Sequence, residues 1–432
     1  MQNKLGGINL SFSFIHAADI HLDSPLTGLE QYEGAPVDKI RSATRDAFKN
    51  LVDTAIKNRV SFIIIAGDLY DGDWKDYNTG LFFASQMVRL QKENINVFLI
   101  RGNHDAASLI TKELKLPDNV IELSTKHSET HLIDELGVAI HGQGFASRSV
   151  EENLVKNYPN RKDGYVNIGI LHTSANGREG HETYAPCTID DMREKGYDYW
   201  ALGHIHKKEL LHEKEPVILF PGNIQGRHIK ESGDKGCTLV TVNDGAIDRL
   251  THLSLDVLRW ELVEVDAAGL DSLEEILDEA RELLEEKYQE VDGRFLAVRF
   301  RIHGSTKAHQ ELLVDKDHFI NNLRSLSIEV GLGDIWIEKV KVETSRLLDV
   351  EELKAQHTPI AVILDFIKDV AADESVLSEL LSEFQDIQQA LPYELRSGEE
   401  GFNFNDSDLI KKRLADVEDL ILYYLTKSEV NA

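Results

Sequence analysis

Residues Phe62-Ile63-Ile64-Ile65-Ala66-Gly67-Asp68 place a carboxylate directly after a run of large apolar residues. Such a run is typical of a strand that is buried on both faces of a sheet. Four more apolar runs, at 14–15, 97–100, 168–171 and 197–202, also lead into polar side chains. The oxygen and imidazole donors that follow the five runs are Asp19, His21, Asp68, Asn103, His104, Asp105, His172, His204 and His206.

We expect these donors to converge, because side chains at the ends of neighbouring strands meet at one edge of a sheet. Asp19 and His21 are two residues apart, so in an extended segment both would point to the same side. Gly67 would let the backbone turn sharply before Asp68, whose two oxygens can bridge two ions. Seven ligands are too many for one ion and suit two: Asp19, His21, Asp68, Asn103, His172, His204 and His206.

Carboxylates, imidazoles and one amide suit Mn²⁺ best, with Fe²⁺ or Zn²⁺ as alternatives, rather than a thiolate zinc site. Two such ions ~3.5–4 Å apart can clamp the attacking and leaving oxygens of a phosphate and turn a bridging water into hydroxide. His104 would protonate the leaving oxygen or stabilise charge on phosphorus. Asp105 could orient the imidazole of His104 or cap the following helix, and we favour orientation.

Composition indicates an intracellular, cytoplasmic protein. The 432 residues contain no stretch of the ~18–20 apolar residues that a membrane span needs, and the N-terminus lacks the pattern of a secretory signal. Only Cys187 and Cys237 are present, without metal-binding spacing. We therefore expect no membrane association.

The net charge of −28 argues against a protein that coats DNA. Residues 1–255 carry a net −7 and residues 256–432 a net −21, so most of the acidity lies outside the region of the predicted ligands. Bound divalent ions would add positive charge where a phosphate must approach.

Strand-like runs alternate with helix-period stretches at 46–59 and 81–90, which predicts crossover connections, and later strands follow at shorter intervals. The pattern favours a four-layer α/β/β/α sandwich over residues 1–255. Residues 256–345 predict a small α+β capping domain, with strands at 258–265, 294–302 and 334–342 and helices at 272–290 and 319–325. Residues 346–432 predict a helical segment.

The strongest helix of that segment has apolar residues at helical spacing from Leu409 to Leu425. It could dock on a partner's helices or pack on its own protein, and the pattern favours neither.

The motifs resemble those of the calcineurin-like metallophosphoesterase superfamily, and more narrowly SbcD-type DNA repair exonucleases of the YhaO-like branch. The resemblance covers about the first 240 residues. It rests on His16-Ala17-Ala18-Asp19-Ile20-His21, Gly67-Asp68-Leu69-Tyr70-Asp71, Gly102-Asn103-His104-Asp105, Leu171-His172-Thr173-Ser174, Gly203-His204-Ile205-His206 and Pro221-Gly222-Asn223-Ile224-Gln225-Gly226-Arg227.

The resemblance implies one metal held by Asp19, His21, Asp68 and His206, and another held by Asp68, Asn103, His172 and His204, with His104 catalytic. It further implies a capping domain and a C-terminal segment that binds an SbcC-like coiled-coil ATPase subunit, and a possible homodimer. Archaeal and eukaryotic relatives have a second catalytic-type histidine three residues after the bridging aspartate. This chain has Asp71 there, which we count with the catalytic residues.

Arg178, His181, Arg227, His228 and Lys230 lie in glycine-containing loops near the motifs and could bind DNA phosphates. Ordinary solvated loop charges are the alternative interpretation.

We therefore expect a divalent-metal phosphodiesterase that cleaves DNA as the nuclease subunit of a repair complex. A small-molecule phosphodiesterase or phosphoprotein phosphatase of the same fold is the first alternative. A DNA-tethering scaffold that does not cut is the second, and the complete ligand set argues against it.

Overall fold

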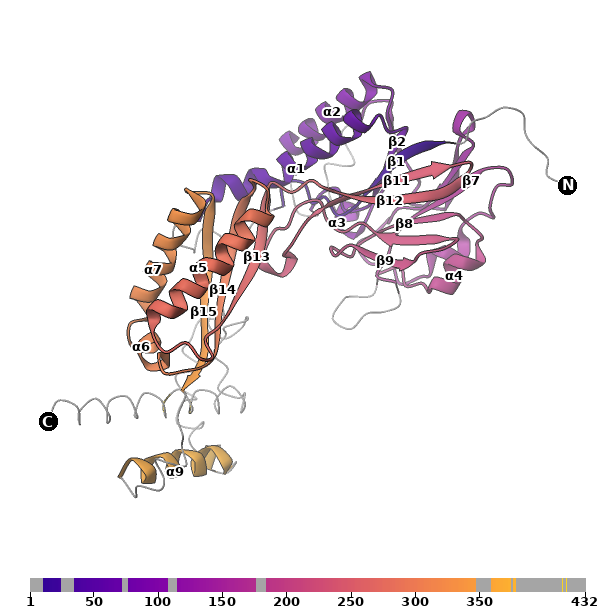
Figure 1. Cartoon of the computed structure of the whole chain (residues 1–432). Helices are drawn as coiled ribbons and strands as arrows, with labels where there is room; N and C mark the ends of the chain where they lie inside the picture. Colours follow the sequence, from indigo (N-terminus) through magenta and orange to yellow (C-terminus); the bar gives the residue numbers. More distant parts are fainter. Residues whose placement is uncertain are drawn as a thin grey trace. The chain divides into compact units, whose positions relative to one another are not determined.

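The structure is a computed structural model, shown in Figure 1. It describes residues 11–24, 35–71, 77–107, 115–175, 184–346 and 359–373, together with Val376, Leu377, Leu414 and Val417. Two compact units are present: 1–262 with 284–299 and 327–339, and 263–283 with 300–326 and 340–432. This division cuts across one small sheet, so the domain boundaries drawn from the sequence stay a prediction.

The first sheet has the strand order β12-β11-β1-β2-β3-β4. Its parallel strands are β1 (Phe12–Ala17), β2 (Phe62–Ala66), β3 (Asn96–Ile100) and β4 (Val120–Glu122). Helices α1 (Val37–Asn58) and α2 (Tyr77–Lys92) connect the first three of these strands, as the alternating pattern predicted. Strands β11 (Gly236–Asn243) and β12 (Ala246–Ser254) extend the sheet in antiparallel fashion.

The second sheet has the order β5-β6-β7-β8-β10-β9. Four strands run parallel: β6 (Val138–Gly142), β7 (Val166–His172), β8 (Tyr199–Gly203) and β10 (Val217–Phe220). The edge strands β5 (Glu129–Ile133) and β9 (Glu209–His212) pair antiparallel. Both sheets are therefore mixed, and both have a parallel centre.

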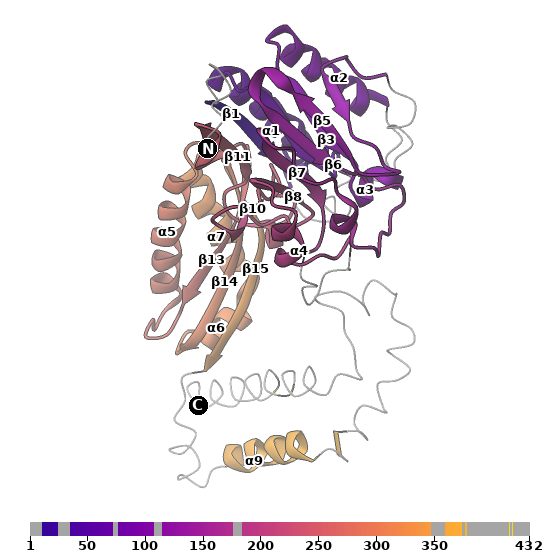
Figure 2. The same cartoon turned by 90° about the vertical axis from the view of Figure 1, so that its right-hand side faces the viewer.

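The sheets and helices of this region stack in layers (Figure 2), and three clusters of buried apolar side chains lie between the layers. Phe14 and Ile64 of the first sheet meet Ile140 and Ile168 of the second in the central layer. Two outer layers are formed by side chains of α1 and α2 against the first sheet, and by side chains around α4 (Ile189–Glu194) against the second. The α/β/β/α sandwich predicted from the sequence is confirmed.

The predicted α+β region forms a separate three-stranded sheet, β13-β14-β15. Its strands are β13 (Leu258–Asp266), β14 (Phe295–Thr306) and β15 (Ile335–Arg346), and its helices are α5 (Leu273–Glu290), α6 (His309–Val314) and α7 (Lys316–Gly331). Helix α7 is longer than the predicted 319–325, because exposed polar residues 316–318 form its first turn and the buried Leu326 continues its apolar side beyond 325.

Helix α9 (Pro359–Ala372) lies within the predicted helical segment 346–432. The predicted helix at 409–425 lies outside the described residues except for Leu414 and Val417, which are both helical. Among the helices that are described, none combines the length and apolar content needed to cross a bilayer.

His16 is a fully buried histidine in β1, and it makes folding pH-dependent. Its Nδ1 lies 2.9 Å from the Tyr199 hydroxyl and its Nε2 lies 3.1 Å from the Leu202 carbonyl. Burial lowers the pKa of His16 from 6.5 to about 3. The unfolded chain therefore binds a proton below pH 6.5 that the folded chain excludes, so stability falls by up to about 1.4 kcal/mol per pH unit between pH 6.5 and pH 3.

Between pH 8 and pH 5 the free energy of unfolding should fall in both proteins. We expect this fall to be about 2 kcal/mol smaller in a His16→Gln variant than in the natural chain. Glutamine is neutral throughout this range, whereas His16 excludes a proton only when folded. Urea unfolding followed by tryptophan fluorescence at the two pH values would measure the difference. Equal pH dependence in both proteins would contradict the assignment.

Candidate metal centre

The predicted ligands lie at or shortly after the carboxyl ends of parallel strands. From the first sheet, Asp19 follows β1, Asp68 follows β2 and Asn103 follows β3 as the first residue of α3 (Asn103–Ala107). From the second sheet, His172 ends β7, and His204 follows Gly203, the last residue of β8. The two sheets therefore deliver one set of ligands to the same edge of the sandwich.

The backbone at this edge is left-handed rather than extended. Asp19, His21, Asp68 and His204 have φ of 51°, 46°, 53° and 106°. The expectation of an extended segment at Asp19 and His21 is therefore wrong, because β1 already ends at Ala17, but both side chains still reach one group of donors. Such φ values cost energy for residues other than glycine and concentrate at functional sites.

Hydrogen bonds between loops hold this backbone in place. The Asp19 amide donates to the Gly67 carbonyl at 3.1 Å, and the His21 amide donates to the Asp68 carbonyl at 3.0 Å. Gly203 lets the end of strand β2 approach closely, since a Cβ at Gly203 would lie 1.9 Å from the carbonyl oxygen of Ala66.

Asp19, His21 and His206 form one group of donors, which we call the first position. One donor atom from each of them lies within 4.8 Å of the other two. The Nε2 atoms of His21 and His206 are 3.1 Å apart, and Asp19 Oδ1 is 4.0 Å from His206 Nε2. His206 is about a quarter exposed, whereas Asp19 and His21 are buried.

Asp68, His172 and His204 form another group, the second position, and His21, Asp71 and His104 form a third group that shares His21 with the first position. Asp68 Oδ2 is 3.4 Å from His172 Nε2 and 3.9 Å from His21 Nε2, so it faces both positions. The side-chain oxygen of Asn103 is 3.0 Å from His172 Nε2, which adds the predicted amide to this position. The structure brings together members of both ligand sets that the family resemblance implied, and the assignment of each residue to a metal stays a prediction.

The electrostatics of Asp68 suit a cation ligand. Burial by itself would raise the pKa of Asp68, but its interactions with His172 outweigh burial and hold that pKa well below its usual range. Burial by itself would lower the pKa of His172, but the charge of Asp68 and its hydrogen bond outweigh burial and raise that pKa to about 9. A carboxylate that stays ionised while buried needs positive charge beside it, which two divalent ions would supply. The donor set therefore fits two divalent ions.

Asp71, not Asp105, is the carboxylate that contacts the imidazole of His104. Asp71 Oδ1 lies 2.8 Å from His104 Nδ1 and 3.0 Å from His21 Nδ1. This hydrogen bond raises the pKa of His104, although burial opposes it. The His104 side chain is about one-third exposed, so a substrate can reach it.

The orientation role that we favoured for Asp105 is therefore wrong. Its carboxylate accepts hydrogen bonds from the backbone amides of Gly102 at 3.0 Å, Leu69 at 3.2 Å and Tyr70 at 2.8 Å. The bond from Gly102 caps helix α3, as the alternative interpretation held, and the other two tie the loop after β3 to the loop after β2. Burial raises the pKa of Asp105 to about 7.

Glu231 is a site residue that the sequence analysis missed. It ends a short 3-10 helix (Ile229–Glu231), and its Oε1 lies 2.6 Å from His206 Nδ1. Burial would raise the pKa of Glu231, but the hydrogen bonds with His206 and the charge of Arg227 hold it well below the usual range. Before the fold is known, a glutamate in a polar loop is indistinguishable from an ordinary solvated charge.

The structure argues against the predicted phosphate contact at Arg227. Its Nη2 donates to Glu231 Oε1 at 3.0 Å, its Nη1 lies 3.7 Å from Asp71 Oδ2, and only 16% of its side chain is exposed. His228 is 54% exposed and stays a candidate for phosphate contact, as does the exposed Lys230. Arg178 and His181 lie outside the described residues.

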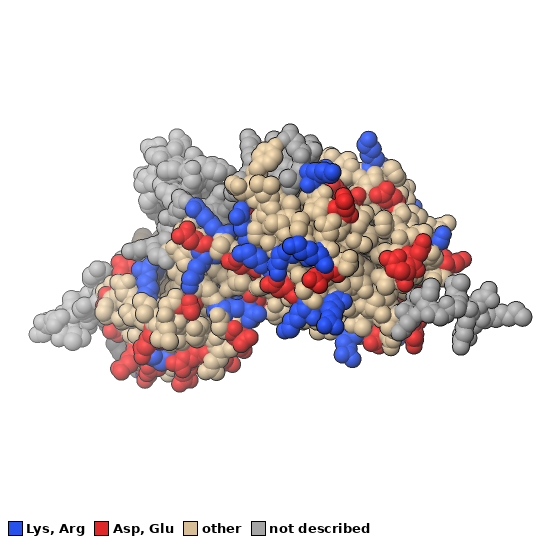
Figure 3. All heavy atoms as spheres, turned by 90° about the horizontal axis from the view of Figure 1, so that it is seen from above, with Lys and Arg blue, Asp and Glu red and all other residues tan. Residues whose placement is uncertain are grey.

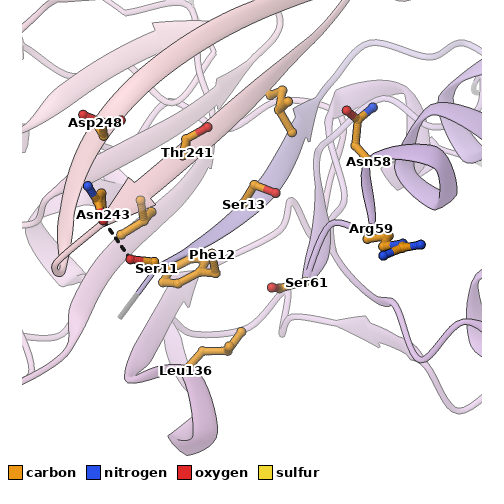
Figure 4. A pocket seen from close by; sticks show the side chains of 12 residues that line it. Ser11, Phe12, Ser13, Asn58, Arg59, Ser61, Leu136, Thr241, Asn243 and Asp248 are labelled. Atoms are coloured by element: carbon orange, nitrogen blue, oxygen red, sulfur yellow. Dashed lines mark hydrogen bonds between the residues drawn. The ribbon is translucent and has the colours of Figure 1, made fainter. Parts of the chain in front are cut away.

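A separate pocket of about 610 Å³ lies at the start of β1, the end of that strand away from Asp19 (Figure 4). Half of its lining residues carry hydroxyl or amide groups, including Ser11, Ser13 and Asn58, four are apolar, and the charged ones are Arg59 and Asp248. It offers little that could hold a metal, so the donor clusters described above remain the candidate site.

Surface charge is mixed on the face that Figure 3 shows. Basic and acidic side chains are interspersed in the picture, and one part of the surface carries a dense group of acidic side chains. Helix α5 contributes part of the acidity of residues 256–432, with exposed Glu274, Glu275, Asp278 and Glu282.

Comparison with known proteins shows two matching families. Residues 12–208 match the calcineurin-like phosphoesterases, and residues 260–345 match the middle domain of metallophosphoesterase YhaO. The uncharacterized metallophosphoesterase YhaO of Bacillus subtilis is 36% identical over 299 residues, which are 68% of this chain and 72% of that protein.

More distant relatives carry the name DNA double-strand break repair protein Mre11. The protein of Archaeoglobus fulgidus is 27% identical and covers 65% of this chain and 65% of its own length. The protein of Sulfurisphaera tokodaii is 25% identical, and the alignment covers 59% of this chain and 66% of that protein. The alignments thus span about two thirds of these relatives.

Proposed function

Because the chain belongs to the calcineurin-like metallophosphoesterases as a YhaO-like member, we propose that it is a Mn²⁺-dependent nuclease that cleaves DNA within a repair complex. The observation that carries this proposal is the pair of donor groups joined by Asp68, with the accessible His104 beside them. Relatives named as DNA double-strand break repair proteins support DNA as the substrate.

Different residues of the chain have different roles in the proposed hydrolysis. When bound, two divalent ions supply polarisation of the phosphodiester and activation of water. Asp71 holds Nδ1 of His104, which leaves Nε2 to donate a proton to the leaving oxygen. The elevated pKa of His104 favours the protonated imidazolium that this step requires. Buried Asp68 keeps the donor groups at a fixed separation.

The proposed partners are DNA, an SbcC-like coiled-coil ATPase subunit and a second copy of the chain. Exposed apolar side chains on α9, Val362 and Phe366, support a binding site for the ATPase in the C-terminal segment. Tyr77, Leu81 and Val88 are exposed on one face of α2, which supports a homodimer.

The test is digestion of end-labelled single- and double-stranded DNA by metal-free protein to which Mn²⁺ is returned. A parallel reaction contains an aryl phosphodiester, and chelator is added to a third. We expect DNA cleavage that requires Mn²⁺, with product lengths that reveal its polarity. An Asn103→Ala variant, which lacks a predicted ligand, controls for a contaminating nuclease and should lose the activity.

Hydrolysis of the aryl ester alone would replace the nuclease proposal with a small-molecule phosphodiesterase. If neither substrate is cleaved, the assay is repeated with the coiled-coil ATPase and ATP. Continued absence of cleavage together with DNA binding would overturn the nuclease proposal in favour of a tethering scaffold.

A further inference from the structure

The two positions differ in the groups that lie behind their histidines. In the first position, Nδ1 of His21 lies 3.0 Å from Asp71 Oδ1, and Nδ1 of His206 lies 2.6 Å from Glu231 Oε1. In the second position, Nδ1 of His172 lies 2.9 Å from the backbone carbonyl of Ala66. Both histidines of the first position thus have a carboxylate behind them, whereas His172 has a neutral oxygen.

Arg227 joins the two carboxylates of the first position. Its guanidinium is 3.0 Å from Glu231 and 3.7 Å from Asp71, and the exposed fractions of the three side chains are 16%, 7% and 13%. Glu231 also accepts hydrogen bonds from the Arg227 amide at 2.8 Å and the Asn223 side chain at 3.0 Å. We call Asp71, Arg227 and Glu231 the carboxylate bridge.

The bridge fixes both imidazoles and adds charge behind them. A carboxylate that accepts a hydrogen bond from Nδ1 keeps the proton of the neutral imidazole on Nδ1. Nε2 then keeps a lone pair for a metal and becomes more basic. Two carboxylates and one guanidinium leave a net negative charge behind the first position. Arg227 also keeps the buried carboxylates from repelling each other, which holds each one against its histidine.

The ligands themselves reinforce this difference. The first position has Asp19 as a carboxylate of its own beside the shared Asp68. The second position has the neutral side chain of Asn103 instead, 3.0 Å from His172. Anionic oxygen donors attract divalent cations more strongly than an amide oxygen does.

We propose that the carboxylate bridge makes the first position the tighter of the two metal positions, so that it fills before the second. Glu231 and Asp71 act here as positioning residues, through His206 and His21. The inference rests on the metal-binding part of the proposed function and is independent of whether DNA is the substrate.

Isothermal titration of the metal-free full chain with Mn²⁺ tests this inference. We expect two binding steps of unequal affinity in the natural protein. A Glu231→Gln variant, which keeps an acceptor but loses the charge, should weaken the tighter step by about 10- to 100-fold. The weaker step should change by less than about threefold.

Asp234→Asn is the matched control. Asp234 is also a carboxylate between a histidine and an arginine, 3.2 Å from His252 Nε2 and 3.0 Å from Arg259. Removing its charge should leave both Mn²⁺ steps unchanged. Asp71→Asn is the second test variant and should weaken the same step as Glu231→Gln, which decides the question if Glu231→Gln does not fold.

Equal affinities in the natural protein would overturn the inference, as would selective weakening of the weaker step in the variants. Two unequal steps in a protein that cuts no DNA would contradict the proposed substrate and leave this inference intact. Two Mn²⁺ binding steps of equal affinity in a protein that does cut DNA would support the proposed substrate and overturn this inference.

Discussion

Replacement of Asp68 by asparagine is expected to lower phosphodiester hydrolysis by at least about a thousandfold, or about 4 kcal/mol of transition-state stabilisation. Asp68 Oδ2 faces His172 of the second position at 3.4 Å and His21 of the first at 3.9 Å. Its Oδ1 accepts a hydrogen bond from the His104 amide at 3.0 Å. Asparagine keeps the size but loses the charge that both positions share.

Two measurements check this prediction: initial rates with Mn²⁺, and the number of Mn²⁺ ions retained after equilibrium dialysis. We expect Asp68→Asn to retain fewer ions than the natural chain. Asp46→Asn removes a carboxylate from an exposed ion pair with Lys49 and should change neither quantity. An Asp68→Asn protein with normal rate and normal metal content would contradict the bridging role.

Replacement of His104 by glutamine is expected to reduce the rate by about 10²- to 10⁴-fold, with metal content unchanged. His104 contacts Asp71 through Nδ1 and is partly exposed. No ligand in either position is removed, so a loss of rate would reflect chemistry rather than metal binding.

The choice of substrate separates the two roles considered for His104. DNA has a poor leaving group that needs a proton, whereas an aryl phosphodiester releases a stable phenolate. If His104 donates the proton, the variant should lose much more rate on DNA than on the aryl ester. Equal losses would favour charge stabilisation at phosphorus, and an unchanged rate on both would exclude a catalytic role.

Much of the fold was predictable because buried strands and helices have recognisable patterns of apolar residues in the sequence. The run at 62–66 forms a strand buried on both faces, and α1 follows the helical spacing of Phe48, Leu51 and Val52. Helix ends were less predictable: α1 begins at Val37 rather than near Asp46, because its first turns bury only Ile40, Ala43 and Thr44.

The two clusters of metal donors were predictable for a related reason. Ligands placed after apolar runs must lie at the ends of strands, and parallel strands carry those ends to one edge. The sequence by itself therefore determined the class of fold, the donor residues that gather at the candidate metal centre and the hard-donor chemistry that they offer.

Only the tertiary structure decided which groups contact one another within that centre. Asp71 rather than Asp105 contacts His104, Glu231 lies behind His206, and Arg227 joins two carboxylates instead of facing solvent. These contacts join loops far apart in the chain, and a hydrogen bond is lost when its atoms shift by about 1 Å. Such distances depend on how the two sheets pack, and periodicity along the sequence does not encode them.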